Sequence, residues 1–574
     1  MTAIDDLLHA IGRPPSADVI GGVAVTIARR AGLDAEALVA PSLLEVADDA
    51  VVGDLPVSVE LLGSLHEHGQ ATATRRRRGS HYTPDDVARR LVQVACPGGP
   101  VGRVCDPAVG GGAFLLAAAD LLTRTGLPRA TIVTERLWGA DIDPLAVDVT
   151  RTALSLWAGA PCPPDRVVVA DTLRHPPPWS HRFDLVVGNP PFLSPLARDT
   201  APSVEARQVL RERFGDACGP YVDSSALFLL VGLGLLEADG HMVLVQPLSF
   251  LAARDAGEVR RRLLEQTCLR GLWVATERVF GAAVEVCAPI VERSRRLGPV
   301  TRYQGRGVAR AGTAPAPSSP GELASLAAPL VGIPPARPSA STTLGERAEV
   351  MAGFRDEYYA IAAATREGGP GPRVVTAGRI GPLRLDPDRR PVRVQRRDYD
   401  DPRVDLAVLR RSGAKVAAWA DRLLVPKVLV ATQTPVIEVV ADPDGTLMPL
   451  TPVLAVIPPP DLVWEVAGLL SAPSISAWAA AHTLGTGRHR GVIKLAAREV
   501  RLLPGLDDPS PWSSVARLAR RAQEAAAEDR WRSLLIQTAA GADRILGVSA
   551  PAVAEWWRRR AGLADPGVGL RRGR

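Results

Sequence analysis

The central part of the chain, from about residue 101 to residue 295, predicts an α/β fold built on a mostly parallel, doubly wound sheet. Short apolar runs rich in β-branched residues alternate there with stretches at helical spacing. A turn of three consecutive glycines follows the first run, and polar side chains stand where several runs end. The runs expected to form strands are Val101–Val104, Trp138–Ile142, Val167–Val169, Leu185–Val187, Met242–Val245 and Leu272–Val274.

The length of 574 residues exceeds what one hydrophobic core usually serves, so we expect at least two domains. A Pro-, Ala- and Ser-rich stretch, a strand-rich patch near residues 424–440 and a long helix over Ser513–Ala539 suggest how the second half is divided. The expected parts are a helical lead-in at 1–74, the α/β domain at 75–305, a connection at 306–340, an α+β domain at 341–508 and C-terminal helices at 509–574.

The composition excludes several classes of protein. Six cysteines are scattered without CxxC pairs, which argues against a zinc site and a disulfide framework. The N-terminus has no basic and apolar leader, and no long apolar run is present, so we expect a soluble cytoplasmic protein with no membrane partner. The net charge of +6 permits a polyanionic partner without requiring one.

The glycine turn Gly110–Gly112 lies between the first expected strand and a helix. Glycines allow a ligand to approach the backbone, although a tight structural turn would have the same sequence. Asp106, at the end of the strand, would repel a pyrophosphate and suits the cationic amino acid end of S-adenosylmethionine. No Gly-Lys-Ser/Thr follows, which excludes a P-loop.

Carboxylates also end the next two expected strands. Asp141 is placed to accept bonds from ribose hydroxyls, while Asp143, followed by a proline, is suited to cap a helix. Asp171 could accept a bond from the amino group of a cofactor adenine, and the alternative is an ordinary turn residue.

The fourth expected strand ends in Asn189-Pro190-Pro191-Phe192. A planar exocyclic amino group is a poor nucleophile because its lone pair is delocalised into the ring. If the Asn189 oxygen and the Pro190 carbonyl accept its two hydrogens, the lone pair is released toward an electrophilic methyl group. Consecutive prolines fix the backbone, and Phe192 offers a face on which an extruded base can stack. A proline-rich loop that only closes a strand is the alternative.

In this order, the motifs resemble those of the gamma group of N6-adenine DNA methyltransferases, over about residues 79–290. The resemblance implies a Rossmann-like class I methyltransferase sheet, preceded here by the helical lead-in and followed by an α+β target-recognition domain. It implies an adenine-specific, site-specific DNA methyltransferase that uses S-adenosylmethionine, acts on duplex DNA and belongs to a restriction-modification or phage-defence system. A separate restriction endonuclease or defence-system subunit would then be a partner, and no metal is expected.

The resemblance also assigns residues. Expected cofactor contacts are Tyr82, Thr83, Pro84, Asp106, Ala108, Gly110, Asp141, Ile142 and Asp171. The catalytic residues are Asn189, Pro190, Pro191 and Phe192, and residues 221–230 resemble a helix that lines the pocket. Phe280 would hold the flipped base with Phe192, although a core role is the alternative for Phe280. Phe192 replaces the commoner Tyr, and Asn189, where cytosine-N4 enzymes usually carry Ser, favours adenine.

Basic segments suggest where DNA would be contacted. Arg488, Arg490 and Lys494 lie in a glycine-rich loop that could contact phosphates, and Arg75–Arg78 precede the cofactor segment. Either segment could instead be a solvated surface. Met351–Phe354 and Pro426-Lys427 are further suggestive pieces of a target-recognition domain.

Three other functions remain open. An RNA or protein-glutamine methyltransferase would use a similar motif, but such enzymes rarely need a long second domain. A non-catalytic DNA-binding modification subunit is disfavoured by the intact set of Asp106, Asp141 and Asn189. A fused restriction-modification enzyme is disfavoured because no convincing nuclease motif is present.

Overall fold

The computed structural model describes residues 3–11, 13–48, 56–69, 83–97, 102–193, 203–277, 279, 284–294, 296–385, 391–487 and 491–564. The chain divides into two compact units, Met1–Leu330 and Val331–Arg574. The boundary falls inside the stretch 306–340, but residues 309–314 of that stretch form a strand of the first unit.

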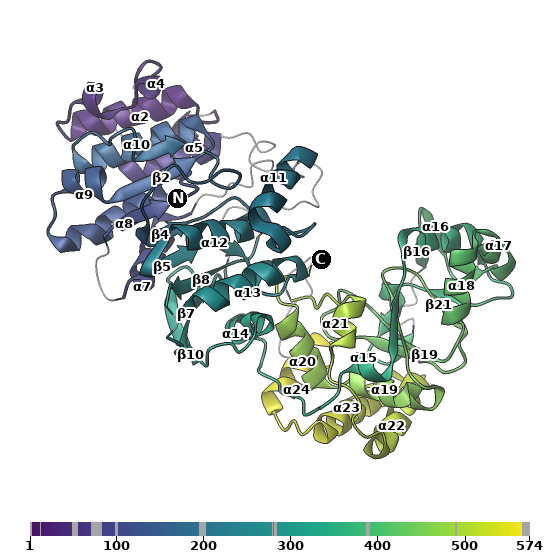
Figure 1. Ribbon diagram of the computed structural model, residues 1–574. Coiled ribbons are helices and arrows are strands. Elements are labelled where there is room, and N and C mark those ends of the chain that lie inside the picture. The colour runs from purple at the N-terminus through teal and green to yellow at the C-terminus, as the bar shows by residue number, and fades with distance from the viewer. Residues whose placement is uncertain are drawn as a thin grey trace. The chain divides into compact units, whose positions relative to one another are not determined.

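The first unit is built on a ten-stranded sheet in the order β10-β9-β7-β8-β5-β4-β1-β2-β3, with β6 paired to β8 (Figure 1). Strands β1 to β5 are parallel neighbours, whereas β8 runs antiparallel between β5 and β7. The strands are β1 Val104–Asp106, β2 Leu137–Asp141, β3 Val167–Val169, β4 Phe183–Gly188, β5 Leu236–Leu244, β6 Gln246–Pro247, β7 Cys268–Val274, β8 Val286–Glu292, β9 Val300–Gln304 and β10 Ala309–Ala314.

This topology confirms the predicted α/β class. Each of the six expected runs corresponds to a strand, although the first strand begins at Val104 rather than Val101. Strand β8 was not expected, and its antiparallel pairing with β5 and β7, like that of β10 with β9, makes the sheet mixed rather than wholly parallel. Its burial is nearly continuous, as is usual for a central strand covered on both faces.

Helices of the first unit connect the strands and cover the sheet. They are α1 Ala3–Ile11, α2 Ala17–Arg30, α3 Ala35–Leu38, α4 Pro41–Leu44, α5 Val59–Gly69, α7 Asp85–Ala95, α8 Ala113–Leu122, α9 Arg129–Glu135, α10 Pro144–Ala158, α11 Val204–Phe214, α12 Ser224–Leu235, α13 Gly257–Gln266 and α14 Leu323–Ala327. Core side chains from α2, α5, α7, α8 and α10 belong to one hydrophobic cluster with those of β1, β2 and β4. The helical lead-in is therefore part of the same core as the sheet.

Helix α5 approaches the glycine turn very closely. A Cβ atom added to Gly63 would lie 2.4 Å from the carbonyl oxygen of Gly111, so neither position has space for a side chain. The backbones of α5 and the glycine turn thus pack directly against each other, so the lead-in contacts the turn without any intervening side chain.

The second unit contains two four-stranded sheets, β11-β22-β19-β20 and β12-β18-β13-β21, and two hairpins. Its strands are β11 Glu349–Ala352, β12 Thr365–Glu367, β13 Arg373–Val375, β14 Ile380–Gly381, β15 Arg384–Leu385, β16 Val392–Val394, β17 Arg397–Tyr399, β18 Pro402–Val404, β19 Lys427–Val430, β20 Val439–Asp442, β21 Leu447–Pro449 and β22 Leu454–Ile457. Its helices are α15 Leu344–Arg347, α16 Arg355–Ala364, α17 Leu406–Arg411, α18 Ala414–Leu423, α19 Val463–Leu470, α20 Pro473–His482, α21 Ala497–Arg501, α22 Ser513–Gln523, α23 Glu528–Ile545 and α24 Pro551–Arg560.

The expected long helix over Ser513–Ala539 was wrong. The chain forms two helices, α22 and α23, with a break over residues 524–527, and Gly541 lies inside α23 rather than at its end. The apolar stripe of α22, centred on Val515 and Ala519, packs against α23. The alanines around the break have high helix propensity, so tertiary burial of both stripes overrides the local preference.

Among the described residues, no single helix is long and apolar enough to cross a membrane. One pair, Pro460–Leu470 and Pro473–His482, passes that test only when the two are taken together, and it is bent by 72°.

Candidate active site

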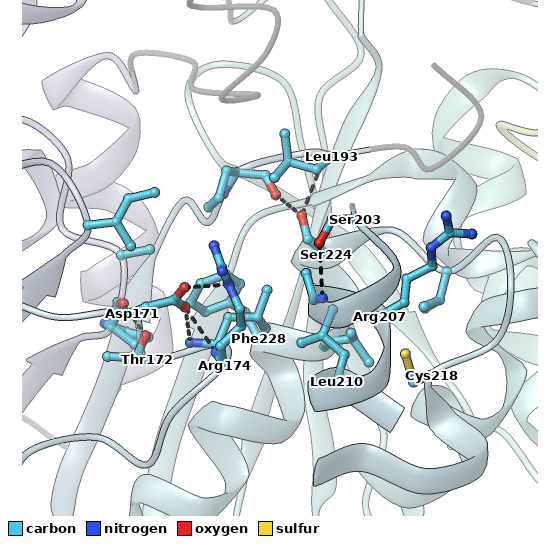
Figure 2. Close-up of a pocket in the computed structure, with 18 of the residues that line it drawn as sticks. Asp171, Thr172, Arg174, Leu193, Ser203, Arg207, Leu210, Cys218, Ser224 and Phe228 are labelled. Atoms are coloured by element: carbon cyan, nitrogen blue, oxygen red, sulfur yellow. Dashed lines mark hydrogen bonds and ion pairs between the residues drawn. The ribbon is translucent and has the colours of Figure 1, made fainter. Parts of the chain in front are cut away.

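A cavity of about 410 Å³ opens in the first unit at the carboxyl ends of the central parallel strands (Figure 2). This edge is where open α/β sheets bind their ligands, and the volume is in the range of small-molecule sites. The wall includes the loops after β1, β2, β3 and β4 and residues of α11 and α12. Lining residues include Pro107, Ala108, Asp141, Ile142, Asp171, Thr172, Arg174, Pro191, Leu193, Ala206, Leu210, Ser224, Leu227 and Phe228.

The glycine turn between β1 and α8 uses backbone conformations that favour glycine. Gly110 has φ +52° and Gly112 has φ +85°, and a Cβ atom added at Gly110 would meet no other atom within 4 Å. The Gly110 N–H donates to Oδ2 of Asp141 at 2.9 Å. The turn is therefore tied to the end of β2 and leaves open space beside its backbone.

Asp106 is the most strongly perturbed carboxyl group of this site. Its side chain is 1 % exposed, and its Oδ1 accepts the N–H of Ala108 at 3.0 Å. Burial, with Asp141 as a further negative neighbour, raises the pKa of Asp106 to about 8, although the bond from Ala108 opposes the shift. Gly188, just before the Asn-Pro-Pro-Phe motif, faces this carboxyl group, since a Cβ atom there would lie 2.6 Å from Oδ1.

Asp141 and Asp143 divide two tasks at the end of β2. Asp143 accepts the N–H of Leu145 at 3.2 Å and caps α10. Asp141 accepts N–H groups from Gly110 and Asp143 and lines the cavity. The buried His66 of α5 lies 3.5 Å from Oδ2 of Asp143, which links the lead-in to this turn.

Asp171 lies in the loop after β3 and lines the same cavity. Its Oδ1 accepts the N–H groups of Leu173 and Arg174 at 3.2 and 2.9 Å, and its Oδ2 pairs with Nε of Arg174 at 2.7 Å (Figure 2). The hydroxyl of Thr172 donates to the carbonyl oxygen of Pro107 at 2.7 Å and so joins this loop to the loop after β1.

The Asn-Pro-Pro-Phe segment follows β4 directly. Asn189 Nδ2 donates to Oγ1 of the buried Thr83 at 3.0 Å, which fixes the orientation of the Asn189 amide. Ser224, the first residue of α12, donates to the carbonyl oxygen of Pro191 at 2.7 Å and accepts the N–H of Leu193 at 3.1 Å. The segment is therefore held from the side of α7 and from the side of α12.

The structure brings together most of the residues singled out from the sequence. Ala108, Asp141, Ile142, Asp171 and Pro191 line the cavity, whereas Thr83, Asp106 and Gly110 lie in the elements around it. Pro84 precedes α7 as its N-cap residue, and half-buried Phe192 packs against the core. Leu227 and Phe228 of the expected pocket helix also line the cavity.

The structure leaves several other expected residues undescribed. Tyr82, Phe280, Arg488, Arg490 and Arg75–Arg78 lie outside the described residues. Lys494 is exposed in the second unit. Lys427 is fully buried and pairs with Asp442, so its side chain has no free surface for DNA in this structure, contrary to its sequence-based association with recognition.

The sequence alone did not indicate the supporting roles of Ser224 and Thr172, or that Thr83 contacts Asn189. Ser224 begins a helix after Asp223, a common N-terminal pattern that carries no functional signal by itself. Thr83 is 106 positions away from its partner Asn189, and no local spacing reveals such a contact.

Comparisons with known proteins agree with this geometry. Residues 60–306 match the N-6 DNA Methylase family. The type II methyltransferase M.VspI of a Vibrio species is 23 % identical over 208 residues, which are 36 % of this chain and 46 % of that protein. The MjaIX methylase subunit of a type I restriction enzyme of Methanocaldococcus jannaschii is 30 % identical over 136 residues, 23 % of each chain. This chain thus spans less than half the length of both relatives.

Among solved structures, the type IIL restriction-modification enzyme MmeI in complex with DNA is similar in fold. The match has a TM-score of 0.54 at 12 % identity and covers 92 % of this chain and 81 % of that chain. Because the match extends over both units, the similarity of fold is not confined to the sheet of the first unit.

The strand order, the antiparallel β8 and the position of the cavity give the first unit the fold of the class I methyltransferases. Residues 60–306 of this unit are those that match the N-6 DNA Methylase family.

Proposed function

We propose that this protein transfers a methyl group from S-adenosylmethionine to N6 of a flipped-out adenine in duplex DNA, as the modification activity of a restriction-modification or phage-defence system. The observation that carries the proposal is the placement of Asn189–Phe192 at the end of β4, beside a cavity whose walls come from the three preceding strand ends. The bond between Asn189 and Thr83 orients the amide that the reaction needs.

The residues around the cavity fit S-adenosylmethionine. Asp106 is a buried carboxyl group whose ionised form an ammonium group would stabilise, which suits the amino acid end of the cofactor. Asp141 lies at the cavity wall, where its oxygens can also accept ribose hydroxyls, and Asp171 lies where it can accept an adenine amino group. Apolar contacts for the adenine ring would come from Ile142 and Phe228.

The reaction then depends on how this chain handles the target amino group. The bound cofactor supplies an electrophilic methyl group on its sulfonium. The side-chain amide oxygen of Asn189 and the backbone carbonyl oxygen of Pro190 accept hydrogen bonds from the two amino hydrogens. The lone pair of the amino nitrogen then becomes available for attack. Phe192 stacks on the extruded base, and such stacking contributes roughly 1–3 kcal/mol toward the cost of flipping.

The second unit supplies the binding surface for DNA in this proposal. Its two sheets and surrounding helices form a compact body separate from the unit that contains the cavity. Exposed Lys494, in the segment with Arg488 and Arg490, is proposed to contact phosphates, which position a protein on duplex DNA without selecting a sequence. Phe280 is proposed to act with Phe192 on the flipped base.

The test is transfer of tritium from labelled S-adenosylmethionine to duplex DNA, followed by digestion and identification of the labelled nucleoside. Label should appear in N6-methyladenine. Asn189→Ala should reduce transfer by about 10²–10³-fold, the scale for loss of one preorganised polar group, with unchanged affinity for the cofactor. Parallel reactions with RNA and protein substrates address the other substrate classes. Label in cytosine, RNA or protein only, or transfer unaffected by Asn189→Ala, would overturn the proposal.

A further inference from the structure

Two neighbouring walls of the cavity are held together by contacts that the methyl-transfer chemistry does not explain. Helix α11 lines the cavity through Ala206, Arg207 and Leu210, and the loop after β3 lines it through residues 170–174. Figure 2 shows Arg207 and Leu210 across the cavity from Asp171 and Thr172. Because these two walls belong to different elements, the distance between them must be fixed by a contact that joins α11 to the loop.

Arg213, in the last turn of α11, joins the two walls. Its Nη1, whose two hydrogens are shared among three acceptors, donates to the carbonyl oxygens of Thr172, Leu173 and His175 in the loop, at 2.7, 2.8 and 2.5 Å. Bonds from a charged donor are stronger than those between neutral groups. Together they fix the path of the loop relative to α11.

The electrostatics of Arg213 agree with a positioning role. The guanidinium is half-buried, and desolvation lowers its pKa, while Asp171 acts in the opposite direction. Its hydrogen-bond acceptors among the described residues are backbone carbonyls, so its charge is used to order a loop and not to neutralise a bonded carboxylate. Arg213 therefore acts on the site mainly by fixing the position of the loop, and only secondarily through its positive charge.

A second arginine fixes the same end of α11. Nη1 of Arg262, in α13, donates to the carbonyl oxygen of Phe214 at 3.0 Å, and its Nε pairs with Glu258 at 2.8 Å. The end of α11 that carries Arg213 is therefore anchored to the body of the unit. Arg213 transmits that fixed position to the loop.

The consequence concerns Asp171. Its carboxylate accepts the N–H groups of Leu173 and Arg174, and the carbonyl of Leu173 is itself held by Arg213. The turn that aims the Asp171 carboxylate into the cavity is thus braced from its outer side. We propose that Arg213 is a positioning residue for the adenine end of the cofactor, which it serves by holding this turn in place. The inference rests on the proposed function.

The test compares Arg213→Met with Arg211→Met, a matched control at an exposed arginine on the same helix. Titration calorimetry gives Kd for S-adenosylhomocysteine, for 5′-methylthioadenosine, and for the analogue of S-adenosylhomocysteine with hypoxanthine in place of adenine. Arg213→Met should raise Kd for both adenine ligands roughly 10-fold and reduce the preference for adenine over hypoxanthine by a similar factor. Arg211→Met should change neither quantity by more than about 2-fold.

Two further measurements separate positioning from general destabilisation. Arg213→Lys keeps a charge that can reach part of the carbonyl set, so it should restore part of the affinity; it also carries the test if the methionine variant does not fold. The value of kcat at saturating cofactor should change less than about 3-fold. Wild-type affinity and wild-type discrimination in Arg213→Met, or in Arg213→Lys as its substitute, would overturn the inference while leaving the proposed function intact. Failure of the wild-type protein to bind S-adenosylhomocysteine would overturn both.

Discussion

The raised pKa of Asp106 predicts that cofactor binding releases a proton. With a pKa of about 8, this carboxyl group carries about 0.9 of a proton at pH 7 in the unbound protein. An adjacent ammonium group favours the ionised form and lowers the pKa. Binding should therefore release about 0.9 of a proton from Asp106, less about 0.1 taken up by the cofactor amino group, whose pKa is near that of an α-amine.

The pH dependence follows with a definite sign. The affinity should rise about 8-fold between pH 6 and pH 7, since Asp106 must be deprotonated to pair with the ammonium group, and only about 2–3-fold between pH 7 and pH 8, because the cofactor amino group begins to lose its own proton there. Above pH 8 the cofactor amino group loses its own proton, and affinity should fall. In the unbound protein the folded-state pKa of Asp106 exceeds the unfolded value near 4, so the stability it contributes is lost as pH rises from about 4 through 8.

Calorimetric titrations in buffers of different ionisation enthalpy measure the number of protons released. Asp106→Asn should bind more weakly, release almost no proton and lose the rise in affinity between pH 6 and pH 8. The control ligand 5′-methylthioadenosine, which lacks the amino acid end, should release none from the wild-type protein. Equal proton release by the two ligands, or by wild type and Asp106→Asn, would refute the assignment of Asp106 to the cofactor amino group.

Three other predictions concern the supports of the site and of the second unit. Thr83→Val removes the hydroxyl that accepts from Asn189, and kcat should fall about 10-fold, with little change in cofactor affinity; an unchanged kcat in single-turnover assays would contradict it, and Thr83→Ser is the control. Gly63→Ala forces a Cβ atom against the Gly111 backbone, and the thermal midpoint measured by calorimetry should fall by several degrees; an unchanged midpoint would contradict the close contact. Lys427→Met leaves Asp442 buried without its cation, and urea unfolding should show a loss of about 3–5 kcal/mol that Asp442→Asn partly reverses in the double variant; full stability of the single variant would be incompatible with a buried pair.

The order of strand ends was accessible from the sequence because its causes are local. A parallel strand buried on both faces is a short apolar run, and polar residues follow it where the chain leaves the core. Asp106, Asp141, Asp171 and Asn189 each stand at such a point, and parallel pairing brings all four strand ends to one edge. The cap formed by Asp143 was predictable for the same reason, since the following proline marks the start of a helix.

What was missed depends on contacts between distant parts of the chain. The place of strand β8 in the sheet follows only from its antiparallel pairing with β5 and β7. The hydrogen bond from Ser224 to the carbonyl oxygen of Pro191 joins residues 33 positions apart. The break between α22 and α23 falls in an alanine-rich stretch that favours helix, so only the packing of the two helices against each other explains it. No periodicity within one element contains this information.

Local sequence signals reveal the residues proposed to act in the reaction, whereas the residues that hold them in position are revealed only by contacts between distant parts of the chain. The carboxylates and Asn189 stand at strand ends, where a family can be recognised, but their positions depend on Thr83, Ser224 and Arg213, which come from three different helices or helix starts. Each of these supports acts through one or a few hydrogen bonds to backbone or amide groups, which many sequences could provide. Variation at the supports can therefore alter cofactor affinity and turnover without disturbing the motif, and in this chain Arg213 is the support with the most bonds to a single loop.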